Sequence, residues 1–271
     1  MISRAQRHRF CTWLIQSTLA RGHELTDAEL QMPALVFAPH PDDEAIACAG
    51  TILRKKQLGA PVRLVFMTDG SRSHEGFIQP ERLSALRRSE ASSAAALMGI
   101  EPDEVIFLDF DDSRLAAQEA AAVARVREIV RATQPAQVFA ASARDRNPDH
   151  RATSRIVRAV LGECRARPQL YEYTVSMWGR WPWCGKIHTG PRPYRLLTQA
   201  MPGLIRCAAF WAQFRDVVTV HSVLDRKHAV LAAHRSQMSP LAPGAWTLPQ
   251  LSDGEFLQWV FCGYEFFRAR R

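Results

Sequence analysis

Two short loops contain the residue types that bind metal ions and activate water. The first reads His40-Pro41-Asp42-Asp43-Glu44. An imidazole and a carboxylate three residues apart can both reach one metal ion across such a turn, and a second carboxylate beside them can act on a metal-bound water. Alternatively, the three acids cap a helix and complement its dipole. That alternative accounts for the carboxylates but not for His40.

The second loop runs from Asp145 to His150 and reads DRNPDH, again before a helical pattern. His150 can supply a third ligand beside His40 and Asp43. Two histidines and one carboxylate with an open position are the ligand set of a catalytic zinc site, whereas structural zinc sites are closed by four protein ligands. The same set also suits Fe(II). The second loop therefore favours the metal-site interpretation of the first.

Strand-like and helix-like patterns alternate along the chain, and each loop follows an expected strand. Short apolar runs predict strands at 34–38, 62–67, 105–108, 137–141, 169–173 and 217–220. Helical patterns occupy 43–58, 80–98, 115–133, 150–165, 222–234 and 253–267. Such β-α units predict an α/β fold with a mainly parallel sheet and helices on both faces. Ligands bind beyond the carboxyl ends of such strands, where both loops fall.

We expect one domain over residues 1–271, with a helical extension at 1–30 and an insertion or lid at 175–214. The insertion is rich in Trp, Pro and Arg. Its notable residues are Trp178, Trp181, Trp183 and Trp211, with Arg180, Lys186, Arg192, Arg195 and Arg206. Aromatic rings stack on sugars, and Trp with Arg is common at membrane interfaces. A satellite core under a long loop is the alternative.

Composition limits the classes of protein to consider. The chain has 271 residues, 47% hydrophobic and 23% charged, which is ordinary for a globular protein. No apolar stretch is long enough for a transmembrane helix; the strongest, 204–214, contains Arg206 and Gln213. A net charge of +8 favours an anionic substrate or membrane face, but the scattered basic residues do not indicate nucleic-acid binding. Six cysteines without a C-x-x-C pair indicate reduced thiols of a cytoplasmic protein.

The run Ala38–Glu44 (APHPDDE), with Asn147–His150 (NPDH) about a hundred residues later, resembles the LmbE-like or PIG-L family. The resemblance extends over 33–153 and returns at 234–237 (HRSQ) and 264–266 (YEF). It implies a Rossmann-like three-layer fold. It also implies a zinc-dependent enzyme that removes the acetyl group from substrates containing N-acetylglucosamine.

Matching the family motif residue by residue, the resemblance makes His40, Asp43 and His150 the zinc ligands. Asp42 becomes the general base that deprotonates the zinc-bound water.

The resemblance also makes Arg87 a substrate-contacting residue and Asp112 a carboxylate that holds sugar hydroxyls. Each has an ordinary structural interpretation. Arg87 can form an ion pair with Glu90 on a helix surface, and Asp112 can be a turn or capping residue.

The sequence departs from the family pattern at Asn147, where many relatives have a histidine. An asparagine can donate a hydrogen bond to a developing oxyanion, but it cannot transfer a proton at neutral pH. Protonation of the departing amine then falls to Asp42. Asp149 can orient a neighbouring ligand or tune a proton-transfer partner. This departure leaves open whether the chain turns its substrate over.

Other histidines carry weaker signals. His74, in a polar loop facing the expected site, can bind substrate, supply a missing acid, or be an exposed loop residue. His234 can line the pocket or interact with the last carbonyls of a helix. His188, His221 and His228 have no motif support and are interpreted as structural.

The sequence thus predicts a cytoplasmic zinc hydrolase that releases acetate from a small or lipid-linked amino-sugar conjugate, with contact at the inner membrane face as an option. One alternative is a deacylase of another N-acylated metabolite or natural product. Another is a catalytically weak, glycan-binding member of the fold. No nucleic-acid partner is expected.

Overall fold

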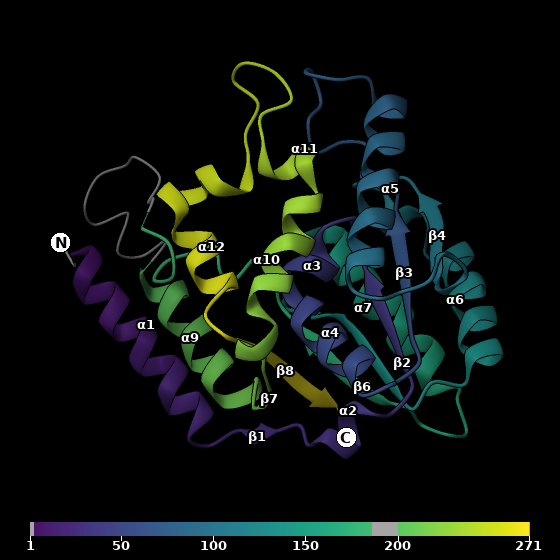
Figure 1. The fold of residues 1–271 in the computed structure, drawn as a ribbon, viewed down its shortest axis with the longest axis horizontal. Helices are drawn as coiled ribbons and strands as arrows, with labels where there is room; N and C mark the ends of the chain where they lie inside the picture. Colours follow the sequence, from purple (N-terminus) through teal and green to yellow (C-terminus); the bar gives the residue numbers. More distant parts are fainter. Residues whose placement is uncertain (1–2, 186–199, 271) are drawn as a thin grey trace.

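The computed structural model describes residues 3–185 and 200–270, and an eight-stranded sheet runs through its centre (Figure 1). The strands are β1 (His23–Glu24), β2 (Ala34–Ala38), β3 (Val62–Thr68), β4 (Val105–Phe110), β5 (Gln137–Ala141), β6 (Gln169–Tyr173), β7 (Asp216–Thr219) and β8 (Tyr264–Arg270). Their order is β1-β7-β8-β6-β5-β2-β3-β4. Neighbouring strands are parallel except where β8 pairs with β6 and β7. The predicted, mainly parallel α/β fold is confirmed.

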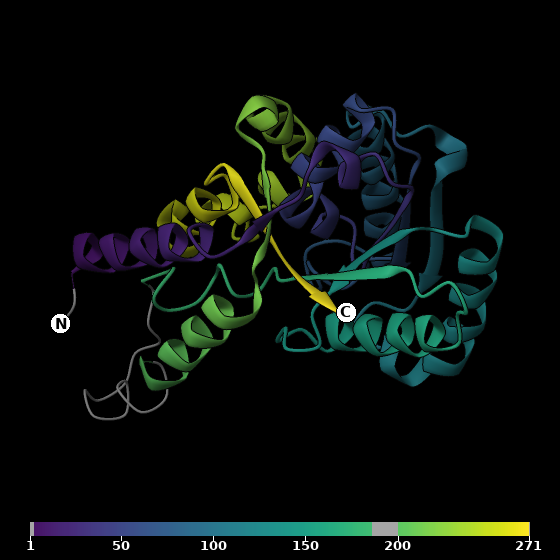
Figure 2. The same ribbon diagram turned by 90° about the horizontal axis from the view of Figure 1, so that it is seen from below.

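Helices cover both faces of the sheet (Figure 2). They are α1 (Arg4–Leu19), α2 (Asp27–Leu30), α3 (Asp43–Ala47), α4 (Ala49–Gln57), α5 (Pro80–Leu97), α6 (Glu119–Thr133), α7 (Pro148–Gly162), α9 (Met201–Gln213), α10 (Leu224–Ala233), α11 (Arg235–Met238) and α12 (Glu255–Val260). Helices α6 and α7 lie on one face, and α4, α5 and α10 lie on the other (Figure 2). Among the described residues, no helix combines the length and apolar composition needed to cross a bilayer.

Strand β2 shows why the sheet is buried on both sides. All five of its residues are buried. Leu35 and Phe37 belong to the apolar core that includes residues of α6 and α7, whereas Val36 and Ala38 belong to the larger core on the opposite face. Because successive side chains of a strand point to opposite faces, a continuous apolar run is what a central parallel strand requires.

The pairing of β2 with β5 sets the position of the chemistry-bearing loops. The chain moves outward from β2 to β3 and β4, then returns to place β5 on the other side of β2. Ala34 pairs with Gln137 and Phe37 with Ala140, in one parallel register. The loops after Ala38 and Ala141 therefore leave the sheet side by side. This reversal of strand order is the place where open α/β sheets bind ligands.

The prediction of one helix over 253–267 is wrong in its second half. Helix α12 ends at Val260, Gly263 turns the chain at a φ of +86°, and β8 follows. The aromatic residues after Gly263 form a strand because β8 pairs with β6 on one side and with β7 on the other. In this position both Phe266 and Phe267 are buried, and aromatic residues favour strands. The predicted helix over 43–58 is also divided, into α3 and α4, at Cys48.

The tryptophans of the 175–214 segment favour the core interpretation over a sugar-binding one. Trp178 and Trp183 are buried and pack edge-to-face with each other and with Phe210 of α9. Trp211 lies under the guanidinium of Arg21. A lid role for the segment stays a prediction. Of the residues singled out there, Lys186, His188, Arg192 and Arg195 lie outside the described part of the chain.

A buried ion pair joins β8 to the helices on one face of the sheet. The Glu265 carboxylate, 3% exposed, accepts hydrogen bonds from the backbone N–H groups of Gly50 and Thr51, each at 2.8 Å, and from the Thr51 hydroxyl at 2.6 Å. The ammonium of Lys227 on α10 donates to it at 2.8 Å. One carboxylate therefore holds α4, α10 and the last strand together.

We expect Glu265→Gln to destabilise the protein by about 3–5 kcal/mol, because it leaves the buried Lys227 charge without a counter-ion. Urea unfolding followed by circular dichroism measures the change. Glu128→Gln is the matched control, since the Arg125–Glu128 pair is exposed at both ends, and we expect a change within about 0.5 kcal/mol. Equal effects of the two substitutions would contradict a structural role for the buried pair.

Candidate active site

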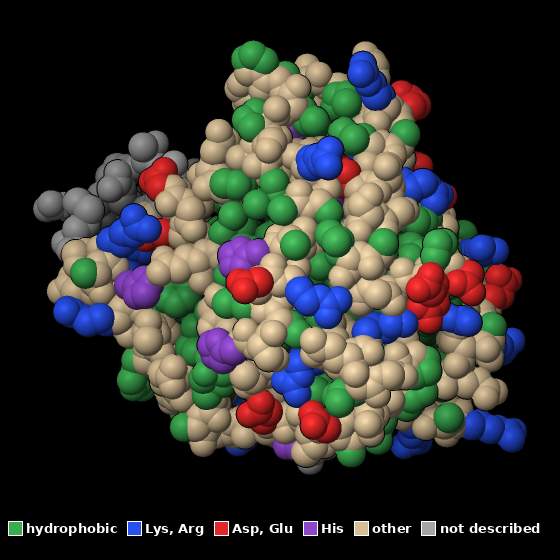
Figure 3. Space-filling view, viewed as in Figure 1, with side chains coloured by type: hydrophobic (Ala, Val, Ile, Leu, Met, Phe, Trp, Pro, Cys, Tyr) green, Lys and Arg blue, Asp and Glu red, His purple; other side chains and the backbone are tan. Residues whose placement is uncertain are grey.

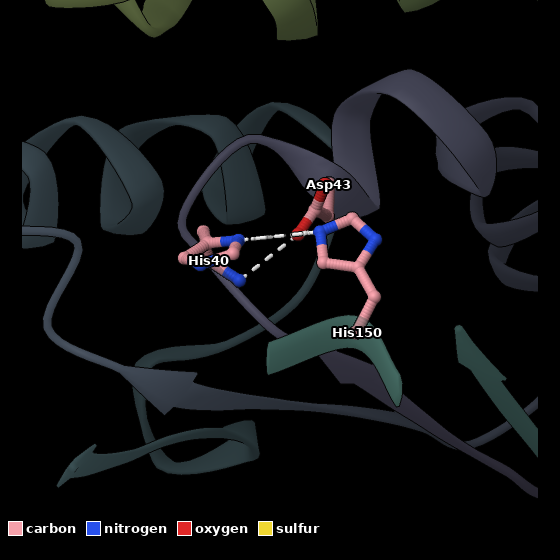
Figure 4. A group of neighbouring side chains, drawn as sticks. All are labelled: His40, Asp43 and His150. Carbon is pink, nitrogen blue, oxygen red and sulfur yellow. Dashed lines mark hydrogen bonds and ion pairs between the residues drawn. The ribbon is translucent and has the colours of Figure 1, made fainter. Parts of the chain in front are cut away.

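Three side chains from the two loops converge on a single point, as Figure 4 shows. One carboxylate oxygen, Asp43 Oδ2, lies 3.1 Å from His40 Nδ1 and 3.1 Å from His150 Nε2. The two imidazole nitrogens are 3.3 Å apart. His40 comes from the turn between β2 and α3, Asp43 is the first residue of α3, and His150 comes from the first turn of α7. All three are buried.

These separations fit a bound metal ion. Ligand atoms at about 2.0–2.1 Å from a tetrahedral zinc ion lie about 3.3–3.4 Å from one another, close to the three distances observed. His40, Asp112 and Asp149 form a second group that can hold an ion, but it offers only one nitrogen. We favour the first group because two imidazoles and one carboxylate leave a coordination position open.

The outward-facing nitrogen of each imidazole lies near a carboxylate. His150 Nδ1 is 3.4 Å from Asp145 Oδ1, and His40 Nε2 is 3.4 Å from Asp149 Oδ2 and 3.5 Å from Asp112 Oδ1. Such partners fix the tautomer and orientation of metal-binding histidines. Asp145 belongs to the second loop motif, but its sequence position indicates no role, because only the folded chain places it behind His150.

The charges of this group are balanced for a cation. Burial lowers the pKa of His40, but hydrogen bonds to Asp112, Asp149 and Asp43 outweigh it and hold that pKa well above its usual value. Burial also opposes protonation of His150, yet Asp43 and Asp145 raise its pKa to about 9. The carboxylates around the two imidazoles are in excess and therefore attract positive charge. Protons on the imidazoles can supply that charge, and a bound divalent ion can supply it instead.

Asp42 is held in a strained position between the metal-site residues and a buried arginine. Its φ of 135° is unusual for a residue with a side chain, and strain of this kind concentrates at functional sites. Its Oδ2 lies 2.9 Å from Arg87. Burial raises the pKa of Asp42 to about 6 against the opposing charge of Arg87. Asp42 makes no capping hydrogen bond, so helix capping does not account for it.

Arg87 does not form the surface ion pair that was the alternative. It is 2% exposed, and its guanidinium donates to the carbonyls of Pro41 and Gly70 and to the Ser73 hydroxyl. Glu90 instead accepts hydrogen bonds from the backbone and the hydroxyl of Ser236. Arg87 therefore braces the loop that carries Asp42, and it also lines the pocket beside that loop.

The remaining predicted residues lie around the same pocket. Asp112 is 5% exposed and accepts hydrogen bonds from the backbone of Arg72 and the hydroxyl of Ser113. The Asn147 side-chain oxygen accepts the Asp149 backbone N–H at 2.8 Å, as the N-cap of α7. The Asn147 side-chain N–H groups make no hydrogen bond to a described residue, and Asn147 lines the pocket. Asp149 is buried behind His40 and does not line the pocket.

His74 and His234 are both buried, and neither lines the pocket. His234 is fully buried and lies 2.7 Å from Glu44 Oε1, and the other oxygen of that carboxylate accepts the Asp42 backbone N–H. His74 is 1% exposed rather than an exposed loop residue. It stacks on Trp246, with ring centres 4.9 Å apart, and joins two loops at the pocket rim.

The pocket over these residues has a volume of about 390 Å³, within the range of small-molecule sites. Its floor is formed by the metal-site residues, Asp42 and Arg87. Apolar side chains that the sequence analysis did not single out form the opposite wall and rim: Val175, Trp246, Leu248, Leu251 and Phe256. They come from the last third of the chain and from the 175–185 segment, far in sequence from the motifs.

Comparisons with known proteins agree with this arrangement. Residues 35–161, which include both loops, match the model of the PIG-L family, described as GlcNAc-PI de-N-acetylase. The chain is 25% identical over 239 residues to a probable N-acetyl-alpha-D-glucosaminyl L-malate deacetylase 2 of Bacillus cereus, covering 85% of this chain and 95% of that protein. A diacetylchitobiose deacetylase of Thermococcus kodakarensis is 34% identical over 82 residues, 30% of each chain.

The fold is similar to that of a solved N,N'-diacetylchitobiose deacetylase from Pyrococcus horikoshii. The TM-score is 0.62 at 19% sequence identity, with 94% of this chain and 86% of that chain covered. The resemblance found in the sequence and the expected three-layer fold are therefore confirmed.

We expect the purified chain to bind one divalent ion at the His40–Asp43–His150 group. Replacing Asp145 by Asn removes the charge behind His150 and lowers metal affinity by about 10–100-fold. His150→Ala removes a ligand and lowers it further. Competition with a chromogenic chelator measures the affinity. The control is His228→Asn, an exposed histidine on α10. A wild-type affinity in His150→Ala would place the ion elsewhere.

Proposed function

We propose that this chain, which carries a PIG-L family domain over residues 35–161, is a metal-dependent N-deacetylase of a small molecule containing N-acetylglucosamine. The observation that carries the proposal is the convergence of His40, Asp43 and His150 next to the buried carboxylate of Asp42 in one pocket. Relatives named as deacetylases of amino-sugar compounds support the same reaction.

The ion we propose is zinc, held by His40, Asp43 and His150. Two imidazoles and one carboxylate are a common set for hydrolytic zinc, although Fe(II) accepts the same ligands. When bound, a divalent ion supplies Lewis acidity that polarises an amide carbonyl and makes water a better nucleophile. Asp145 and Asp149 act as positioning residues for the two imidazoles.

Asp42 is the group we assign to proton transfer. It accepts a proton from the water that attacks the acetyl carbonyl carbon. A pKa raised by burial keeps it basic near neutral pH while allowing it to release the proton again. Arg87 holds one Asp42 oxygen at 2.9 Å and leaves the other for the water. When the carbon–nitrogen bond breaks, Asp42 returns the proton to the departing amine, and the products are acetate and a free amino sugar.

Asn147 is the residue we assign to the oxyanion. Its side-chain oxygen is occupied by the N-cap hydrogen bond, so the amide N–H groups are what it offers to the pocket. An amide N–H can stabilise the negative charge that develops on the carbonyl oxygen, but it cannot supply a proton to the amine. Of the described pocket residues, we therefore assign proton return to Asp42.

The substrate end of the pocket combines polar and apolar surface. Asp112 and Arg87 lie at the polar end and are the candidates for contacts with sugar hydroxyls. Trp246, Leu251 and Phe256 offer apolar surface for the remainder of the conjugate. We propose a cytoplasmic enzyme whose substrate is a soluble or lipid-linked amino-sugar conjugate.

We expect metal-loaded protein to release acetate from at least one member of a panel of N-acetylglucosamine conjugates. The panel contains the free sugar and its nucleotide-, inositol-, malate- and lipid-linked forms. Asp42→Asn lowers kcat by about 10²–10⁴-fold because it removes the proton acceptor. The matched control is Asp103→Asn, an exposed carboxylate outside the pocket, with activity unchanged. An enzymatic assay for acetate measures release.

Metal-loaded protein that releases no acetate from any conjugate would contradict the proposal in its present form. Asn147→His then separates the two alternatives. Recovered release on the same panel identifies a binding protein that has lost proton transfer at this position. Continued inactivity identifies a deacylase of a different N-acyl compound.

A further inference from the structure

Helix α9 is apolar on all sides, yet one side faces solvent. Its thirteen residues read MPGLIRCAAFWAQ, with Arg206 as the single charged side chain. Gly203, Cys207 and Phe210 are buried against the core. The outward face consists of Met201, Leu204, Ile205, Ala208 and Ala212, all exposed. A helix that is apolar all round is normally covered on every side, but no described part of the chain covers this face.

Helix α1 extends the same apolar surface. Helices α1 and α9 run side by side in the same direction and project from one end of the fold (Figures 1 and 2). The Trp211 indole N–H donates to the Ser17 hydroxyl at 2.8 Å. Trp13 lies one turn before Ser17 and therefore on the same face of α1. Ala208 likewise lies nearly one turn before Trp211, on the same face of α9. Trp13 therefore lies on the α9 side of α1.

Exposure singles out these two helices. The three most exposed large apolar side chains in the described part of the chain are Ile205 at 65%, Trp13 at 59% and Met201 at 51%. Leu204 adds 45%. Scattered apolar residues are normal on a surface, but a contiguous group indicates an interaction site. We call Trp13, Met201, Leu204 and Ile205 the α1–α9 patch.

In sequence, the segments that carry the patch contain basic residues and no acidic ones. Residues 1–23 and 173–215 together contain ten of the 35 Lys and Arg residues and none of the 27 Asp and Glu residues. The rest of the chain therefore carries a slight excess of acid, although the whole has a net charge of +8. Figure 3 shows blue, purple and green side chains at the left edge, with some red beside them.

Only part of this charge is neutralised by the fold. Glu255 of α12 pairs with both Arg4 and Arg7. Arg9, which is exposed, and Arg206, which is half-buried, have no ion pair with any described residue. The patch is therefore bordered by uncompensated cations.

We propose that the α1–α9 patch binds the surface of an anionic lipid bilayer, with α9 lying in the interface. Exposed apolar residues, a tryptophan and flanking arginines are the combination by which helices bind such surfaces. Juxtaposed basic residues add electrostatic attraction to anionic headgroups. A second copy of this chain fits the patch less well, because pairing would bring two acid-free, basic segments together. This inference does not depend on the proposed reaction.

The test is cosedimentation of the full chain with vesicles. We expect binding to phosphatidylcholine vesicles that contain about a third phosphatidylglycerol, weaker binding to phosphatidylcholine alone, and loss of binding as salt is raised. Ile205→Glu lowers the partition coefficient at least about tenfold, because it removes apolar contact and adds a repelling charge. Trp13→Ala lowers it to a smaller extent.

The matched control is Leu97→Glu, which places the same charge at an apolar residue of similar exposure, 46%, at the end of α5. We expect it to bind vesicles like the wild type. Circular dichroism and metal content confirm that each variant is folded. Absence of wild-type binding to the anionic vesicles, or equal loss in Leu97→Glu, overturns the proposal. A wild-type dimer that Ile205→Glu converts to a monomer, without vesicle binding, assigns the patch to a second copy.

Discussion

The parallel pairing of β2 with β5 is the constraint on which the rest of the structure depends. Because Phe37 and Ala140 are neighbours in register, the turns that follow the two strands leave the sheet at one edge. Residues about a hundred positions apart in the chain then meet there, and His40, Asp43 and His150 come within 3.3 Å of one another. A slip of either strand would separate the imidazoles and remove the site.

Burial of many charges at this edge is unfavourable unless each has a partner. The structure supplies partners in pairs: Asp145 behind His150, Asp149 and Asp112 behind His40, and Arg87 beside Asp42. Carboxylates remain in excess around the two imidazoles. The site is therefore arranged to accept an added cation. The buried carboxylates that make folding unfavourable without a counter-ion are the same groups that can hold a metal ion.

The last third of the chain stabilises the catalytic turn from outside it. His234 binds Glu44, Ser236 binds Glu90 on the helix of Arg87, and Glu265 binds the first turn of α4. The segments 234–237 and 264–266, where the sequence resembles the family again, contain none of the three metal-site residues. These contacts indicate that their role is to support the site. They hold α3, which begins at Asp43, α4, which follows it, and α5, which carries Arg87. The Glu44 carboxylate that His234 contacts also accepts the Asp42 backbone N–H, which helps to keep Asp42 at its unfavourable φ.

The sequence alone predicted most of the local elements, the mainly parallel sheet and the three side chains that the fold brings together as a possible metal site, because apolar runs, turn signals and ligand types are local properties. The prediction failed for 264–270, because the aromatic residues there are compatible with a helix or a strand. Pairing with β6 and β7 in the folded sheet decides for a strand. The sequence alone also gave no role to Asp145 and did not place the partners that His74, Arg87 and His234 have in the fold. Only the tertiary structure decided these, because hydrogen bonding and burial of a side chain depend on which distant elements pack against it.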